Sequence, residues 1–120
     1  MRPLLTPPVA LQPAPPWWEQ WAAGFVVVML TGAVLGDIYL GKITKWNDPK
    51  LVEMNRGLTL PTLAIAPTYR ADGSGTTFVF TSYLSAISPE WKEKVGSSTS
   101  VKWVVGNGAR GNDGIAATVR

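Results

Sequence analysis

The residues of this chain best suited to chemistry lie in one glycine-rich loop, residues 70–77, which reads RADGSGTT. A short apolar run at 63–66, typical of a strand, precedes the loop, and a helical pattern follows it. Glycines and hydroxyls between a strand and a helix leave several backbone N–H groups at the positive end of the helix dipole, where they can hold an oxyanion. We therefore interpret the segment as an anion-binding loop, and phosphate is the expected anion.

The residues of the loop suit different tasks in binding an anion. The guanidinium of Arg70 is a fork of donors that fits a tetrahedral oxyanion, and Asp72 can hold that fork in place. Ser74 and Thr76 can donate hydroxyl hydrogens, while Gly75 and Thr76 can present backbone N–H groups in the first helical turn. The predicted phosphate contacts are therefore Arg70, Ser74, Gly75 and Thr76, with Asp72 orienting the arginine.

Each of these residues also has a purely structural interpretation. Arg70 could be a surface arginine paired with Asp72, Asp72 could only shape the loop, and Ser74 could only cap the helix. Capping and anion binding are compatible, because both use the unpaired donors of the first helical turn. Gly73 is expected to serve the loop's conformation, and Thr77 could point away from the site.

The composition excludes several kinds of chemistry. The 120 residues contain no cysteine and no histidine, so disulfides, thiol catalysis, a Ser-His-Asp triad and most zinc sites are excluded. Ser74 has no histidine to activate it, and the lysine of a P-loop is missing after the glycines. We expect a binding protein and not an enzyme, with no metal and no cofactor. The net charge of +3 comes from scattered basic residues, which argues against nucleic acid as a partner.

The first 35 residues differ from the rest of the chain. Residues 1–20 are rich in proline, which disfavours a regular helix or a central strand. Residues 21–35 are apolar and nearly uncharged, but the run is shorter than the roughly 20 residues of a membrane-spanning helix. A secretory signal would need a basic start close to its apolar core. We favour a buried strand near residues 25–29 or a leader outside the fold, with membrane contact left open.

From residue 30 onward, the sequence predicts alternating helices and extended segments, as in an α/β protein. The expected elements are a helix around 34–38 that stops at Gly41, a short helix from the Asp48 cap to Asn55, an extended segment over 60–70, a helix over 74–86, a short helix over 91–95 after the Ser88 cap, a strand over 101–105, a glycine-rich turn over 106–111 and a last helix capped by Asn112.

Several side chains are expected to pack in the core. Four positions of the 74–86 helix region recur at i, i+3, i+4 and i+7 and are predicted to share one buried face, namely Phe80, Tyr83, Leu84 and Ile87. We expect three tryptophans to pack against the protein and not to stack on a ligand, since phosphate has no ring. These are Trp46, Trp91 and Trp103. Asn112 and Asp113 are interpreted as a capped helix start in preference to a second polar site.

Three segments together resemble a known family. Residues 35–48 (LGDIYLGKITKWND), 69–78 (YRADGSGTTF) and 111–117 (GNDGIAA) are similar to segments of the periplasmic phosphate-binding protein of the ABC-type phosphate importer, in the family's order. The resemblance covers about residues 30–120. It implies an α/β fold that is part of one lobe of a two-lobed periplasmic-binding-protein fold. Residues 30–120 would form a partial second lobe, and residues 1–29 a Pro- and Trp-rich leader outside the family.

The resemblance also implies a function. It predicts binding of inorganic phosphate for import, ABC-transporter permease subunits as partners and a periplasmic location, although no convincing signal peptide is present. Because the chain stops inside its last predicted helix, we expect a fragment that binds phosphate weakly on its own. The alternatives are a phosphate-ester hydrolase that uses the same loop, which the lack of histidine and cysteine disfavours, and a membrane-associated fragment without function.

Overall fold

The computed structural model describes residues 28–120. The predicted leader, the buried strand and the membrane or signal alternatives fall mostly on residues 1–27, which lie outside the described residues. The elements in chain order are α2 (Gly32–Tyr39), α3 (Pro49–Met54), β1 (Thr68–Arg70), α4 (Gly75–Ile87), α5 (Pro89–Lys94), β2 (Asn107–Ala109) and α6 (Gly111–Val119). This alternation of helices with two short strands is the predicted α/β class.

α3 begins and ends at the residues that the sequence indicates, and α2 ends before Gly41 as predicted, although it begins at Gly32, after an N-cap at Thr31 that was not predicted. Asp48 is the N-cap of α3, its side chain accepts from the backbone N–H of Lys50, and Pro49 takes the first helical position. After α2, Gly41 adopts a φ of +80°, a left-handed conformation that glycine reaches at no steric cost. These local signals need no tertiary contact, which is why the sequence alone predicts them.

One serine separates the two middle helices. The backbone N–H of Ser88 donates to the carbonyl of Leu84 at the end of α4, over 2.9 Å. The hydroxyl of Ser88 then accepts from the N–H of Trp91, over 3.2 Å, and caps α5. Pro89 cannot continue α4 but fits the first turn of α5. The predicted helix over 74–86 and the Ser88 cap are therefore confirmed, with α4 shifted by one residue.

The predicted buried face of α4 is only half right. Leu84 is fully buried and Phe80 is partly buried, as expected. Tyr83 and Ile87 are 47% and 37% exposed, so the prediction is wrong for these two.

The reason is that α4 packs through a polar position. Thr81 is fully buried, and its hydroxyl lies 2.8 Å from the carbonyl of Thr77. The same hydroxyl accepts from the N–H of Ser98, over 3.2 Å, and thereby holds the loop after α5 against the helix. Because of this contact, the buried face of α4 includes Thr77 and Thr81. Hydrophobic spacing could not reveal this, because it treats threonine as a surface residue.

The two strands form a small parallel sheet. β1 pairs with β2 in the register Thr68 to Asn107 and Arg70 to Ala109. The strand predicted over 101–105 is wrong, because that segment is irregular and the strand lies in the predicted glycine-rich turn.

Close approach of two backbones explains the position of β2. Gly106 adopts a φ of +107°, and a Cβ built on it would lie 2.6 Å from the carbonyl oxygen of Pro67. Only glycine permits this contact. It brings the N–H of Asn107 to within 2.9 Å of the same oxygen, so that the pairing with β1 begins there. The glycines that predict a turn are therefore those that let the two strands meet.

The core consists of two clusters that share Tyr39. The first contains Val34, Ile38, Ile43 and Leu51, and the second contains Leu40, Leu84 and Trp91. Trp103 lies at the centre of the aromatic side chains around the second cluster: its ring stacks on Tyr69 with centroids 4.9 Å apart, and lies 5.7 Å from Tyr39 and 6.0 Å from Trp91. Trp91 is fully buried, while Trp46 and Trp103 are partly buried, which confirms their predicted packing role.

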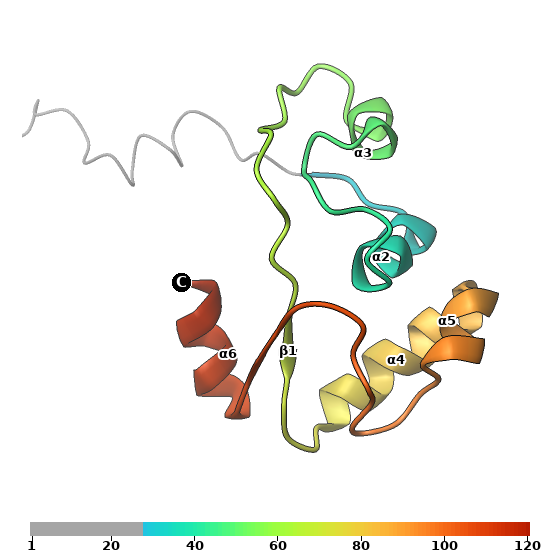
Figure 1. Ribbon diagram of the computed structural model, residues 1–120, viewed down its shortest axis with the longest axis vertical. Coiled ribbons are helices and arrows are strands. Elements are labelled where there is room, and N and C mark those ends of the chain that lie inside the picture. Colours follow the sequence, from blue (N-terminus) through green and yellow to red (C-terminus); the bar gives the residue numbers. More distant parts are fainter. Residues whose placement is uncertain (1–27) are drawn as a thin grey trace, which may run out of the picture.

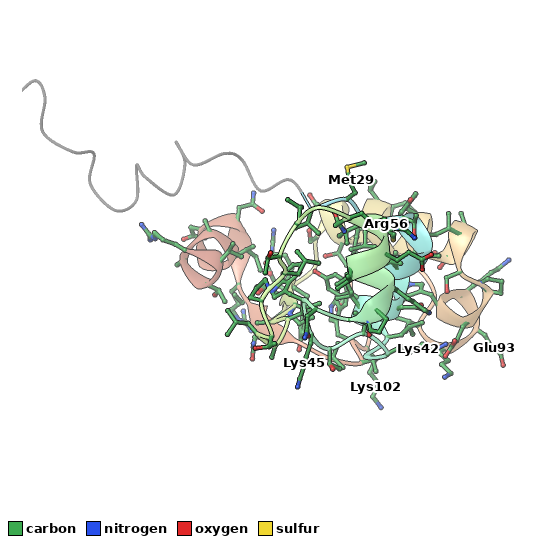
Figure 2. The ribbon with its side chains drawn as sticks, turned by 90° about the horizontal axis from the view of Figure 1, so that it is seen from above. Met29, Lys42, Lys45, Arg56, Glu93 and Lys102 are labelled. Atoms are coloured by element: carbon green, nitrogen blue, oxygen red, sulfur yellow. The ribbon has the colours of Figure 1, made fainter. Side chains whose placement is uncertain are left out.

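The helices stand on different sides of the sheet. In Figure 1, α6 lies on one side of β1, and α4 and α5 lie on the other. The helices α2 and α3 lie toward the end at which the chain enters β1. Figure 2 shows charged side chains such as Lys45, Lys102 and Glu93 projecting outward from this body. Among residues 28–120, none of the helices has the length and apolar character of a membrane-spanning segment.

Candidate anion-binding site

The predicted loop lies where β1 ends, with Arg70 as the last residue of the strand. Its guanidinium forms a two-pronged pair with Asp72: Nε lies 2.6 Å from Oδ1, and Nη2 lies 2.7 Å from Oδ2. Such parallel hydrogen bonds fix the plane of the guanidinium as well as its position. The Arg70 side chain is only 18% exposed. The geometry expected of an oriented arginine is therefore present.

Hydrogen bonding keeps both members of the pair ionised. The guanidinium of Arg70 holds the pKa of Asp72 far below its usual range, and the backbone N–H of Gly111, which donates to Oδ1 over 3.2 Å, adds to this effect. The hydrogen bond from Arg70 to Asp72 in turn raises the pKa of the arginine. Asp72 therefore stays a carboxylate and Arg70 stays a cation throughout the physiological range.

A third residue, Asn112, also binds this arginine. Its Oδ1 accepts from Nη1 of Arg70 over 2.7 Å, from the first turn of α6. The prediction that Asn112 caps this helix is wrong: the N-cap is Arg110, and no side-chain cap hydrogen bond is present there. The only signal in the sequence was the GNDG segment itself, because nothing in that segment points to an arginine 42 positions away.

The hydrogen bonds of Arg70 leave part of its fork free. A guanidinium has five N–H donors. Nε donates once to Asp72, Nη2 donates to Asp72 and over 3.4 Å to the carbonyl of Gly73, and Nη1 donates once to Asn112. The second N–H of Nη1 has no partner among the residues that the structure describes. One charged, oriented donor is thus ready for an anion.

The first turn of α4 supplies further donors. Ser74 is the N-cap, and its hydroxyl oxygen accepts from the N–H of Thr77 over 3.2 Å, which leaves the hydroxyl hydrogen to be donated. The backbone N–H groups of Gly75 and Thr76 have no hydrogen-bond partner within residues 28–120. Ser74 and Thr77 are buried, whereas Gly75 and Thr76 are exposed. The cap role of Ser74 is confirmed, and its role as a phosphate ligand stays a prediction.

An open cavity of about 510 Å³ lies between Arg70 and the first turn of α4. Arg70 and Thr76 both line it, together with Asn112, whereas Asp72, Ser74 and Gly75 do not. The remaining walls are largely apolar and come from β1, α4, α6 and the aromatic cluster, and they include Tyr69, Phe80, Trp103, Ile115 and Val119. Low-polarity walls strengthen the attraction between a cation and an anion.

The chemistry of the site is that of a receptor for an anion. It offers one oriented cation, unpaired N–H groups at the start of a 13-residue helix and hydroxyl donors. Within the described part of the chain, no group of three or more His, Cys, Asp or Glu side chains could hold a metal ion.

The chain belongs to the PBP superfamily, because a domain of that superfamily matches residues 20–120.

The most informative relatives are phosphate-binding proteins. The chain is 58% identical over 90 residues to the phosphate-binding protein PstS of Pasteurella multocida, which covers 75% of this chain and 26% of that protein. It is 56% identical over 91 residues to PstS of Haemophilus influenzae, and 41% identical over 104 residues to PstS of Methanocaldococcus jannaschii. The predicted resemblance to periplasmic phosphate-binding proteins is therefore confirmed. The matched segment spans about a quarter of the length of these relatives.

Proposed function

We propose that this chain binds inorganic phosphate as part of the substrate-binding component of an ABC-type phosphate importer. Support comes from the relatives, which are named phosphate-binding proteins, and from a site that offers donors to an anion. Residues 30–120 would then form part of the second of two lobes, after a leader over 1–29. The protein would bind phosphate in the periplasm without catalysing a reaction. It would then deliver the phosphate to the permease subunits of the importer.

The observation that carries this proposal is that Arg70 and the first turn of α4 face one cavity. The oriented guanidinium supplies charge and geometry, while Thr76 lines the same cavity from the helix N-terminus. We assign the phosphate contacts to Arg70, Ser74, Gly75 and Thr76, and the orienting role to Asp72. A dianion placed there would pair with the free Nη1 hydrogen of Arg70 and with the unpaired N–H group of Thr76, and the assigned contacts with Ser74 and Gly75 would be made at the rim of the cavity.

The test is a phosphate titration of the ¹⁵N-labelled 120-residue chain, followed by NMR across the millimolar range. Chloride at matched ionic strength controls for screening of surface charge. We expect the amide signals of Gly75 and Thr76 to shift and saturate with phosphate and not with chloride. Shifts that are equal for both salts, or that spread evenly over the surface, would contradict the proposal.

Two arginine variants sharpen the test. Arg70→Ala should weaken phosphate binding at least tenfold, because an oriented charged donor is lost. Arg56→Ala is the matched control, because Arg56 is exposed after α3. We expect wild-type titration curves for this control. Equal effects of the two substitutions would mean that only net charge matters.

A further inference from the structure

A residue outside the loop contributes to the order of the anion site. Asn112 belongs to α6, yet its Oδ1 is the acceptor for Nη1 of Arg70 at 2.7 Å. Nη1 is also the nitrogen that carries the unpaired hydrogen of the guanidinium. Because the guanidinium is planar, a bond from one Nη1 hydrogen to Asn112 helps Asp72 to hold the whole group in place, and with it the direction of the free hydrogen.

The contact belongs to a network that ties α6 to the loop. Asp72 accepts from Nε and Nη2 of Arg70, and its Oδ1 also accepts from the N–H of Gly111, next to Asn112. The guanidinium is thus held on one edge by the loop and on the other by α6. Since Asn112 and Thr76 both line the cavity with Arg70, this second support lies on the side that an anion would approach.

The charge of the acceptor at position 112 also matters. Asp72 already neutralises Arg70, and the exposed Asp113 acts on the arginine through space as a further negative charge. A carboxylate at position 112 would be a third negative charge beside a site for an anion. A side-chain amide can accept the Nη1 hydrogen bond without adding charge.

We propose that Asn112 is a positioning residue for phosphate binding, which orients the free Nη1 donor of Arg70 from α6 while adding no negative charge to the site. The proposal rests on the function assigned above to this site. The orienting role of Asn112 and the effect of its missing charge are tested separately by two substitutions at this position.

Asn112→Ala removes the acceptor and tests orientation. In the phosphate-free chain, the two hydrogens of Nη1 should exchange faster by rotation about the Cζ–Nη1 bond, as followed by ¹⁵N-detected NMR of the guanidinium. Phosphate affinity should fall about fivefold, because a hydrogen bond that directs a charged donor is lost. Asn47→Ala, whose side chain makes no hydrogen bond within residues 28–120, is the control for both measurements. Unchanged Nη1 rotation in Asn112→Ala would overturn the orienting role, whatever happens with phosphate.

Asn112→Asp keeps the acceptor and changes only its charge. Nη1 rotation should stay as slow as in the wild type, while phosphate affinity should fall about tenfold through repulsion of the dianion. Wild-type affinity in this variant would overturn the claim about charge. A residue that only braced α6 would tolerate this replacement, because the hydrogen bond is retained. Absence of any saturable phosphate shift in the wild type would instead refute the proposed function, while the rotation measurement would still decide whether Asn112 orients Arg70.

Discussion

Nη1 of Arg70 and Oδ1 of Asn112 lie 2.7 Å apart, although 42 positions separate the two residues in the chain. The contact joins the end of β1 to the first turn of α6. Together with the Asp72 pair, it gives a partly buried arginine defined partners on both edges of its guanidinium. An arginine held in this way loses little side-chain freedom when it binds an anion, which favours recognition.

The 120-residue chain should bind free phosphate with a dissociation constant above about 1 mM, the equivalent of roughly 4 kcal/mol. Ion pairs open to solvent contribute roughly 0–1 kcal/mol, and donors at an exposed helix N-terminus contribute roughly 0.3–1 kcal/mol. Isothermal titration calorimetry with phosphate is the measurement. A micromolar constant would show that the site is completed in solution, for example by self-association.

The two roles of Ser74 should separate by substitution. Ser74→Ala removes the N-cap of α4 and should lower the free energy of unfolding by about 1 kcal/mol, measured by urea denaturation. Ser74→Asp keeps a good cap but brings a negative charge to the first turn, so it should retain more stability than Ser74→Ala and yet lose phosphate binding. Ser100→Ala, at an exposed position, is the control. Wild-type phosphate binding in Ser74→Asp would contradict the assigned contact.

Stability should depend on pH through Asp72. Because the pKa of this carboxylate is lowered on folding, its contribution is complete above the unfolded value of about 3.9 and fades as the pH falls through the lower folded value. Asp72→Asn should therefore be less stable than the wild type at neutral pH. The difference in stability between the two proteins should become smaller in acid. Thermal unfolding from neutral to acidic pH measures this. Glu53→Gln, at an exposed position of α3, is the control. A difference in stability between Asp72→Asn and the wild type that stays constant with pH would contradict the prediction.

The approach of β1 and β2 should require glycine at position 106. Gly106→Ala places a methyl group 2.6 Å from the carbonyl oxygen of Pro67 in a left-handed backbone conformation, so it should cost about 1–3 kcal/mol of stability. Gly73→Ala is the matched control, because nothing lies within 4 Å of its added methyl group and its φ is ordinary. Urea unfolding distinguishes the two. Equal stability of both variants would mean that the loop relaxes freely around position 106.

Trp91 should be a main source of stability. Its side chain is fully buried, and its Nε1 donates to the carbonyl of Gly96 over 3.0 Å. Trp91→Ala should cost about 3–5 kcal/mol. Trp91→Phe retains a ring and should cost less, which keeps the test informative where the alanine variant does not fold. Val79→Ala, at a 67% exposed position, should stay within about 0.5 kcal/mol of the wild type.

Features that depend on neighbouring residues could be predicted from the sequence. The caps at Asp48, Ser74 and Ser88 follow from side chains that bond to N–H groups two or three positions on. Pairing of Arg70 with Asp72 follows in the same way, since a loop of three residues brings the two groups together. The α/β alternation and the position of the anion-binding loop were likewise predictable.

Features that depend on contacts between segments far apart in the chain could not be predicted in this way. The buried face of α4 turns toward Thr81 because the loop at Ser98 bonds to it. The strand lies at 107–109 and not at 101–105, because Gly106 alone lets the chain approach Pro67 so closely. Asn112 reaches Arg70 because the parallel pairing of β1 with β2 places the start of α6 beside the end of β1. Local sequence patterns do not predict such contacts, because the contacts depend on how distant segments pack.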